Sequence, residues 1–341
     1  MPAIIASQAI DIQPSWKTEF SQCVSSIDEL LACLQLKPGQ LATSHQAARD
    51  FPLRVPRPFI ERMEVGNPND PLLAQVLPVL QETQPAVGFS SDPLEETRHN
   101  PVPGIVHKYG NRLLLIVSPS CAINCRYCFR RHFPYQENRQ NKEQWQQALL
   151  YLGKSKEINE VIFSGGDPLA ANDSFLGWLA EQIANIPHIK RLRIHSRLPV
   201  VIPSRIDESF LSWATATRLV PIMVLHINHG NEINPSVADM VQKLSAKGML
   251  VLNQTVLLKG VNDSSEVLAQ LSESLYDIGV TPYYLHLLDP VAGASHFDIS
   301  QQRALQIYAQ LQGELPGFLV PKLVREIPGE KSKTLVAKKK I

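Results

Sequence analysis

Three of the five cysteines lie within eight residues, in the segment Cys121-Ala-Ile-Asn-Cys125-Arg-Tyr-Cys128. The C-x3-C-x2-C spacing puts three thiolates on one short loop, where they can bind three irons of a [4Fe–4S] cluster and leave the fourth open. The amino and carboxylate groups of S-adenosylmethionine (SAM) can chelate that iron. A zinc site and three buried cysteines without function are the alternatives. Structural zinc usually has four ligands, and the nearby candidate His132 lies awkwardly close in sequence.

The cysteine loop resembles the radical SAM superfamily, whose C-x3-C-x-aromatic-C motif is matched by the three cysteines and Tyr127. In that superfamily the aromatic residue contacts the adenine of SAM, which implies this role for Tyr127. A glycine-rich loop near the SAM amino group corresponds to Gly165, Gly166 and Asp167 here. Two glycines allow a close backbone approach, and Asp167 can accept from an ammonium. By itself, Gly-Gly-Asp is more often only a turn.

A narrower resemblance is carried by seven stretches: Asn67–Leu72, Pro101–His107, Cys128–Arg131, His226–Glu232, Asn253–Leu258, Gly260–Asp263 and Pro282–Tyr284. They are similar to the lysine 2,3-aminomutase family, in register over about residues 50 to 335. That family combines the cluster and SAM with pyridoxal phosphate (PLP), held as an imine on a lysine. Its Pro-Gly-Gly-Gly-Gly-Lys segment matches residues 328–333, which implies Lys333 as the PLP lysine.

The PLP lysine must be able to lose its proton, which partial burial promotes by disfavouring the ammonium. From the residues alone, Lys333 would belong to a solvated basic tail with Lys331 and Lys338–Lys340. Three of the family's glycines are replaced here, so Lys331 stays an alternative.

The resemblance also implies roles for charged residues. Arg112, and second to it Lys108, match the stretch that contacts the PLP phosphate, and a guanidinium suits phosphate geometry. Arg130 matches the arginine that holds the substrate α-carboxylate; the alternative is a structural partner for a nearby acid. Asp289 and Glu326 match two acids that bind the distal ammonium of lysine, and such a pair favours a cationic substrate. The family has aspartate in place of Glu326, whose reach is one methylene longer.

Three further polar residues, Arg197, His226 and Gln254, lie at or near the ends of predicted strands. They match family positions that line the SAM side of the site. Each is equally explained as a structural polar residue with its hydrogen bonds satisfied. The remaining histidines and aromatic residues are interpreted as core or surface.

The candidate residues must be positioned by strands and helices, which are predicted to alternate from about residue 111. Strands are predicted at Arg112–Val117, Glu160–Ser164, Arg191–His195, Pro221–His226, Leu250–Val256 and Pro282–Leu287. Helices are predicted at Lys142–Leu152, Ser174–Ile186, Glu208–Thr217, Pro235–Ala246, Ser264–Ile278 and Gln301–Gln312, with caps at Asn141, Asp173, Asp207, Asn234 and Asp263. Six such units with apolar strands indicate an α/β fold, a partial (β/α)6 barrel with its chemistry at the carboxyl ends of the strands.

The chain divides into three predicted parts. Eleven prolines between Pro38 and Pro103 interrupt helical patterns, which predicts a helical, loop-rich arm over residues 1–105. The radical SAM partial barrel follows over residues 106–315, and residues 316–341 form a short closing tail that carries the PLP lysine.

The composition excludes several classes of protein. With 33 Lys and Arg against 32 Asp and Glu, the formal charge of +1 attracts neither nucleic acid nor an anionic membrane. Apolar runs such as Leu113–Val117 are far shorter than a membrane-spanning helix, and the N-terminus has no secretion signal. An odd number of cysteines without a paired framework favours a reducing compartment, so a cytoplasmic protein is expected.

The resemblance implies conversion of L-α-lysine to β-lysine by a 1,2-amino migration that a 5′-deoxyadenosyl radical initiates. A one-electron donor such as flavodoxin or ferredoxin is implied as a partner. The alternatives are an aminomutase or epimerase acting on another amino acid, a radical SAM enzyme that modifies RNA, and an iron–sulfur-binding interaction protein.

One departure from the larger catabolic members concerns zinc. They carry zinc-binding cysteines in a C-terminal tail, whereas no cysteine follows Cys128 here and Ser264 stands at a further zinc position. No zinc is therefore predicted, and a homo-oligomer would use a different or weaker interface. In lacking this tail, the chain is similar to short members of the family, which resemble the enzyme that supplies (R)-β-lysine for modification of elongation factor P. This resemblance implies a synthetase-like partner for the chain.

Overall fold

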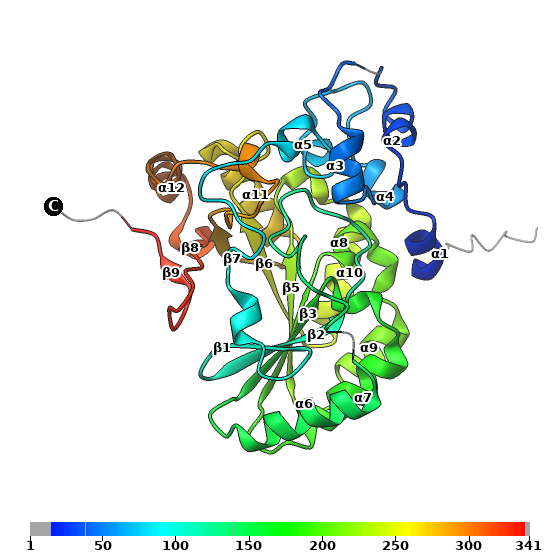
Figure 1. Cartoon of the computed structure of the whole chain (residues 1–341), viewed down its shortest axis with the longest axis vertical. Coiled ribbons are helices and arrows are strands. Elements are labelled where there is room, and N and C mark those ends of the chain that lie inside the picture. The colour runs from blue at the N-terminus through cyan, green and yellow to red at the C-terminus, as the bar shows by residue number, and fades with distance from the viewer. Residues whose placement is uncertain (1–14, 38, 139, 338–341) are drawn as a thin grey trace, which may run out of the picture.

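The computed structural model describes residues 15–37, 39–138 and 140–337, and its centre is one nine-stranded sheet (Figure 1). The strands lie in chain order: β1 (Ile105–Tyr109), β2 (Arg112–Ser118), β3 (Glu160–Gly165), β4 (Arg191–Ser196), β5 (Val220–His226), β6 (Leu250–Val256), β7 (Thr281–His286), β8 (Lys322–Arg325) and β9 (Thr334–Leu335). Strands β2 to β8 are parallel, and β1 and β9 are antiparallel to their neighbours. The sheet is therefore mostly parallel, as predicted.

Helices follow the parallel strands and cover one side of the sheet (Figure 1): α6 (Lys142–Lys154), α7 (Asp173–Ala184), α8 (Leu198–Val201), α9 (Glu208–Ala214), α10 (Pro235–Ala246), α11 (Ser265–Asp277) and α12 (Gln301–Glu314). Helix α10 shows why they pack there. Its buried residues Val237, Met240, Val241 and Leu244 recur at the helical period, so one apolar stripe faces the strands. Among the described residues, no helix is long and apolar enough to cross a membrane.

The sheet curls into an incomplete barrel. Lys108 lies in β1 and Glu326 follows β8 directly, yet the Nζ of Lys108 is 2.9 Å from Oε1 of Glu326. In a flat sheet, strands seven places apart would be separated by more than about 30 Å. The two edges must therefore bend toward each other, and the predicted partial barrel is confirmed.

All six predicted strands and the six predicted helices are present, with ends that differ by at most three residues. The caps are confirmed where side chains accept from the backbone three residues later: Asn141, Asp207 and Asn234. Two predicted caps, Asp173 and Asp263, are wrong by one residue, because Asn172 caps α7 and Ser264 caps α11. The carboxylate of Asp173 instead forms a 2.7 Å ion pair with Arg205.

The closing tail contributes more structure than predicted. Strand β8 adds a parallel strand beside β7, and β9 turns back against β8. The predicted basic residues Lys338–Lys340 lie outside the described residues. The tail therefore extends the sheet and returns Lys333, just before β9, toward the interior of the barrel.

The N-terminal part contains short helices: α1 (Trp16–Ser21), α2 (Ile27–Cys33), α3 (His45–Asp50), α4 (Arg57–Ile60) and α5 (Pro71–Ala74). Their buried residues, including Leu30 and Phe59, belong to the same hydrophobic cluster as Phe163 of β3. This part is helical and loop-rich as predicted, and it shares one core with the barrel.

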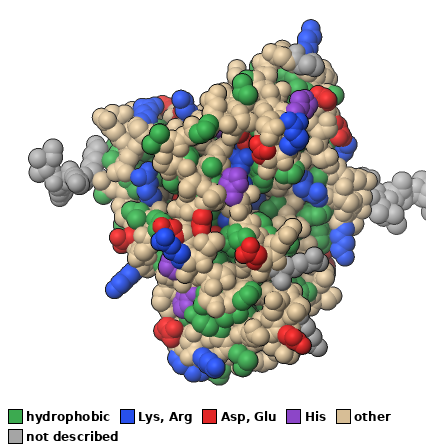
Figure 2. All heavy atoms as spheres, in the orientation of Figure 1, with side chains coloured by type: hydrophobic (Ala, Val, Ile, Leu, Met, Phe, Trp, Pro, Cys, Tyr) green, Lys and Arg blue, Asp and Glu red, His purple; other side chains and the backbone are tan. Residues whose placement is uncertain are grey.

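The face in Figure 2 carries basic and acidic side chains interspersed among apolar and neutral ones. This agrees with the near-zero formal charge of +1. Because binding to a nucleic-acid backbone needs a basic patch or stripe, this face offers no such surface.

Candidate active site

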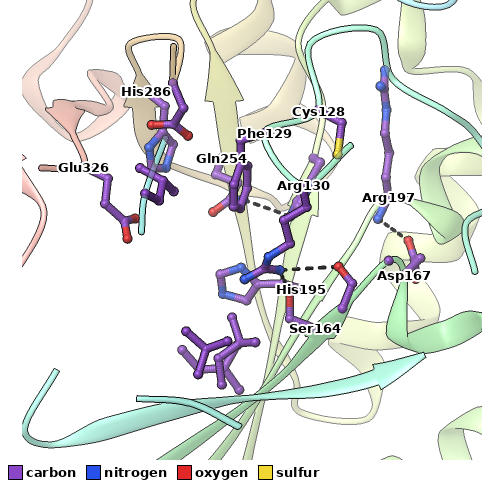
Figure 3. A pocket seen from close by; sticks show the side chains of 18 of the residues that line it. Cys128, Phe129, Arg130, Ser164, Asp167, His195, Arg197, Gln254, His286 and Glu326 are labelled. Carbon is purple, nitrogen blue, oxygen red and sulfur yellow. Dashed lines mark hydrogen bonds between the residues drawn. The ribbon is translucent and has the colours of Figure 1, made fainter. Parts of the chain in front are cut away.

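A cavity of about 640 Å3 occupies the interior of the curled sheet, and every predicted metal, cofactor and substrate residue lines it. These residues come from strands β1, β2, β3, β5 and β6, from the loops after β2, β3, β4, β7 and β8, and from the tail. In Figure 3, Cys128 and Arg197 lie on one side of the cavity, and His286 and Glu326 on the other. The fold thus brings the whole predicted set together in one place.

The three cysteines lie on the loop after β2. A backbone hydrogen bond of 3.0 Å from Cys128 N to Cys125 O fixes the turn between them. Burial, reinforced by Cys125, raises the pKa of Cys128 to about 11, and burial raises that of Cys121 well above its ordinary value. Bound iron would hold the thiols as thiolates.

Among the described residues, no three His, Cys, Asp or Glu side chains converge on a site for a single metal ion. The three thiols nevertheless face a common cavity. Three thiols on one loop can bind three irons of a cluster, whereas structural zinc usually has four ligands.

The N-terminal arm anchors the cysteine loop, which sequence reasoning did not predict. Arg126, between two of the cysteines, is fully buried and forms a 2.6 Å ion pair with Glu82 of the arm. Its guanidinium also donates to the carbonyl oxygens of Phe51 and Ala47. Since removing one partner of a buried pair leaves an uncompensated charge, the loop position depends on the arm.

The two glycines at the end of β3 are required by the protein itself. Gly165 has a φ of +129°, and a Cβ at Gly166 would lie 2.8 Å from the carbonyl oxygens of Pro119 and Ser120. Backbone hydrogen bonds from Gly166 N to Ser118 O (2.7 Å) and from Asp167 N to Ser120 O (2.8 Å) join the same segments. We expected these glycines to let the backbone approach a ligand. In the structure they let the end of β3 approach the start of the cysteine loop.

Asp167 is fully engaged by protein donors. Its carboxylate accepts from Ser196 Oγ (2.7 Å) and from the backbone nitrogens of Arg197 (2.9 Å), Leu198 (2.9 Å) and Leu169 (3.0 Å). A carboxylate has about four acceptor sites, so none remains free for the SAM ammonium. Burial raises the pKa of Asp167, against these hydrogen bonds. The arrangement favours a positioning role that joins the ends of β3 and β4.

Arg197 and Tyr127 form a buried network beside the cysteines. The Nη1 atom of Arg197 donates to Cys125 Sγ (2.7 Å) and to the Tyr127 hydroxyl (2.6 Å). The Nη2 atom donates to Gln75 Oε1 (2.7 Å) and Glu232 Oε2 (3.0 Å). Arg197 therefore orients both the predicted adenine-contacting residue and a predicted cluster ligand.

Three members of this network were missed by the sequence reasoning. Glu232 lies in a stretch already compared with the family, His226–Glu232, whereas nothing in the sequence marks Gln75 of the N-terminal arm. Asn228, from the same stretch, donates to the Tyr127 hydroxyl at 2.6 Å.

Three histidines face the cavity. Gln254 Nε2 donates to His226 Nε2 at 2.9 Å, and burial, together with Arg197 and Arg130, lowers the pKa of His226 to about 3. Burial also lowers the pKa of His195 and His286 well below the ordinary value. The interpretation of His195 and His286 as core or surface is wrong, because both line the cavity. Their places at or near the ends of β4 and β7 were the signal that could have found them.

The tail brings Lys333 to the cavity in an ion pair. Its Nζ lies 2.7 Å from Glu326 Oε2, and the other carboxylate oxygen of Glu326 lies 2.9 Å from Lys108 Nζ. Although burial opposes this, the two lysines lower the pKa of Glu326 well below its usual range. Lys331 is exposed, whereas Lys333 lines the cavity, so the structure favours Lys333.

The two predicted phosphate contacts differ in their surroundings. Lys108 is 2.9 Å from Glu326 and 3.6 Å from Glu96, so carboxylates already neutralise it. Arg112, at the start of β2, packs over the Tyr109 ring at 4.2 Å and donates to Asn111. Within the described part of the chain no carboxylate pairs with Arg112, which makes it the better of the two for an anion.

The predicted substrate residues lie in two groups. Arg130 forms an ion pair with Glu96 at 2.7 Å and donates to Ser164 at 2.8 Å, as the dashed line in Figure 3 shows. Glu96 is therefore the structural acid partner that was the alternative interpretation of Arg130. Asp289 lies on the other side with Glu326. Burial, reinforced by Glu326 and opposed by Lys333, raises the pKa of Asp289 to about 7.

Comparisons with known proteins agree with this geometry. Residues 115–271 match the model of the Radical SAM superfamily. The chain is 54% identical over 325 residues to the L-lysine 2,3-aminomutase of Haemophilus influenzae, covering 95% of this chain and 96% of that protein. It is 53% identical to that of Escherichia coli K12 (94% and 93% covered) and 31% identical to that of Clostridium subterminale (94% and 77% covered). Such similarity over nearly the whole length shows that the chain belongs to the lysine 2,3-aminomutase family of radical SAM enzymes.

Proposed function

We propose that this protein converts L-α-lysine to β-lysine by a radical 1,2-amino migration. The observation that carries the proposal is that one cavity is lined both by the C-x3-C-x2-C loop and by Lys333. The ion-pair partner of Lys333, Glu326, lies across the cavity from Cys128 in Figure 3. A reaction that needs both SAM and PLP requires their sites to open into a common space.

The family implies the [4Fe–4S] cluster, SAM and PLP. When bound, they supply a 5′-deoxyadenosyl radical and a conjugated ring that stabilises the migrating nitrogen. The chain would hold the cluster with Cys121, Cys125 and Cys128, and PLP with Lys333 and Arg112. Tyr127 would pack on the adenine of SAM, the role that the resemblance implies.

The residues around the SAM site have distinct parts in this proposal. Arg197 fixes Tyr127 and Cys125 through its Nη1 atom. His226 and Gln254 form a neutral, hydrogen-bonded pair on the cavity wall. Gly165, Gly166 and Asp167 set the distance between β3 and the cysteine loop. The enclosing barrel keeps water from the reacting atoms.

The charges in the cavity suit lysine. Arg130 offers a guanidinium for the α-carboxylate, and Asp289 and Glu326 offer carboxylates for the distal ammonium. Glu326 already pairs with two lysine ammoniums, that of Lys333 at 2.7 Å and that of Lys108 at 2.9 Å. A neutral or anionic side chain would offer Asp289 no opposite charge.

The direct test is anaerobic incubation of the reconstituted protein with L-lysine, SAM, PLP and dithionite. We expect β-lysine, identified by chromatography against both enantiomers, and no isomer from L-glutamate. Glutamate is the matched control because its side chain has the opposite charge. Absence of any lysine isomer from protein with intact cofactors would reject the proposal.

The pKa of Asp289 makes lysine binding depend on pH. Because its value of about 7 lies above the ordinary 3.8, Asp289 of the folded protein loses its proton only as the pH rises through about 7. The ionised form attracts the distal ammonium, so the KM for L-lysine should fall between about pH 6 and about pH 8.

The control for this dependence is Asp289→Asn, which should raise the KM and flatten its pH profile. The raised pKa also means that the stability of the unliganded fold falls as the pH rises from about 4 through about 7, because Asp289 ionises first in the unfolded chain. The variant should remove this fall in thermal unfolding. An unchanged profile in Asp289→Asn would show that another group titrates.

Further proposals rest on the resemblance alone. They are the (R)-configuration of the product, its use for modification of elongation factor P by a synthetase-like partner, and flavodoxin or ferredoxin as the reductant. A cytoplasmic site of action, homo-oligomerisation and the three-part division at residues 105 and 315 also remain proposals.

A further inference from the structure

The structure assigns a positioning function to Glu96: we propose that this N-terminal-arm carboxylate fixes Arg130 so that one edge of its guanidinium receives the α-carboxylate of the substrate. The inference rests on the proposed function, because it presumes an amino-acid substrate. Nothing in the sequence marked Glu96, which lies in the short 3-10 helix Glu96–His99, before the barrel begins.

The contacts of Arg130 show which of its hydrogens remain free. Glu96 accepts from Nε at 2.7 Å and from Nη2 at 2.8 Å, which occupies the side edge of the guanidinium. Nη1 donates to Ser164 Oγ at 2.8 Å and makes a longer contact of 3.4 Å with the carbonyl oxygen of Gly165. Of the five N–H groups of an arginine, one on Nη2 therefore remains free, and the long contact leaves the neighbouring Nη1 able to donate to a substrate carboxylate instead. Two parallel donors are the arrangement that binds a carboxylate in a bidentate manner.

Burial makes this orientation firm. Glu96 is 4% exposed and Arg130 is 7% exposed. The planar group of Arg130 also packs over the Phe129 ring at 4.9 Å. A bidentate contact and an aromatic face together restrict rotation of the guanidinium. Arg130 therefore presents the same edge to the cavity before substrate arrives, which lowers the ordering cost of binding.

Glu96 itself is held by an unusual piece of backbone. Its amide donates to Asp92 Oδ1 at 3.0 Å. The preceding residue, Glu95, has a φ of +50°, and among the described residues only Gln35 shares a positive φ without being glycine. A left-handed conformation at such a residue persists where the surroundings determine it. Here it directs Glu96 inward, while Glu95 stays outside in a surface pair with Arg98.

Glu96 also connects the two groups of substrate residues. Its Oε1 lies 3.6 Å from Lys108, which pairs with Glu326, which in turn pairs with Lys333. Positive and negative charges thus alternate across the cavity from Arg130 to Lys333. This alternation compensates each buried charge.

The test compares Glu96→Gln with Glu95→Gln in the reconstituted holoenzyme. Binding of L-lysine and of L-lysine amide, which lacks the anionic carboxylate, is measured by equilibrium dialysis together with turnover of L-lysine. For Glu96→Gln we expect lysine affinity to fall about 10- to 100-fold, the usual scale for residues that orient a ligand-binding group. The affinity for lysine amide should change little, and Glu95→Gln should resemble the wild type.

Each outcome bears on one proposal. If Glu96→Gln lowers the affinities for lysine and lysine amide equally, the residue is merely structural and the inference is wrong; equal affinities in Glu96→Gln and the wild type also refute it. Glu96→Asp, which keeps the charge, should restore part of the preference for lysine. If the wild type and Glu95→Gln bind lysine but form no β-lysine, the proposed function fails independently of Glu96.

Discussion

Lys333→Ala should abolish covalent PLP attachment and lower the turnover of L-lysine by on the order of 10⁴-fold or more, the scale seen when a covalent catalytic residue is removed. The expectation rests on the positions of two lysines in the tail: Lys333 lines the cavity, whereas Lys331 is exposed to solvent. Reduction of the wild-type holoenzyme with borohydride should fix PLP to one peptide. Mapping should place the adduct on Lys333.

The matched control is Lys331→Ala, two residues away in the same loop. Its side chain is in solvent, so it should keep wild-type turnover and the borohydride adduct. An adduct on Lys331 or on Lys108 would remove the assignment. Lys333→Ala also deprives Glu326 of a partner at 2.7 Å, so added alkylamines, which restore an ammonium, are expected to recover a little activity.

The parallel sheet and its helices were predictable because they depend on local pattern. Apolar runs such as Leu250–Val256 and the stripe of α10 have the period of the element that they form, and their observed bounds equal the predicted ones. The prediction that Asp173 and Asp263 cap their helices was wrong, because adjacent polar residues compete for the same backbone donors. A difference of one residue there depends on tertiary contacts, such as the ion pair between Asp173 and Arg205.

The short strands β8 and β9 were not predicted, for a different reason. Strand β9 has only two residues, Thr334–Leu335, and is stabilised by pairing with β8 rather than by its own pattern. Pairing partners distant in sequence leave no local periodicity. The consequence matters for function, since this pairing turns Lys333 back toward Glu326.

The cysteines of the candidate site were found by their type and spacing, and Arg130 and Lys333 by the family resemblance, but the partners of these residues were not predicted. The cysteines, Arg130 and Lys333 all line the cavity as predicted. Glu96, Gln75 and the neutral histidines were missed, because their significance lies in contacts between remote segments. Asp167 shows the converse, since its acidic character suggested a ligand contact whereas four protein donors fill its acceptor sites.

Replacing Cys121, Cys125 and Cys128 together by alanine should remove the paramagnetic signal of the reduced cluster and all reductive cleavage of SAM. The three thiols lie on one loop that faces the cavity, and no other cysteine lines it. The triple variant has no thiolate on this loop to bind iron. The histidines on the cavity wall belong to distant strands, so we expect that they cannot replace the cysteines as ligands. Both readouts are made on anaerobically reconstituted protein, with and without L-lysine.

The two remaining cysteines provide matched controls that separate ligation from folding. Cys33 is exposed, so Cys33→Ala should keep the full signal and full SAM cleavage. Cys23 lies beneath the loop, with its thiol 3.4 Å from the carbonyl oxygen of Ala122, and Cys23→Ala should keep the cluster while lowering stability by about 1 kcal/mol. A paramagnetic signal that survives in the triple variant would place the cluster elsewhere. Loss of the signal in Cys23→Ala alone would instead make Cys23 a ligand, because its thiol already touches the loop that the other three share.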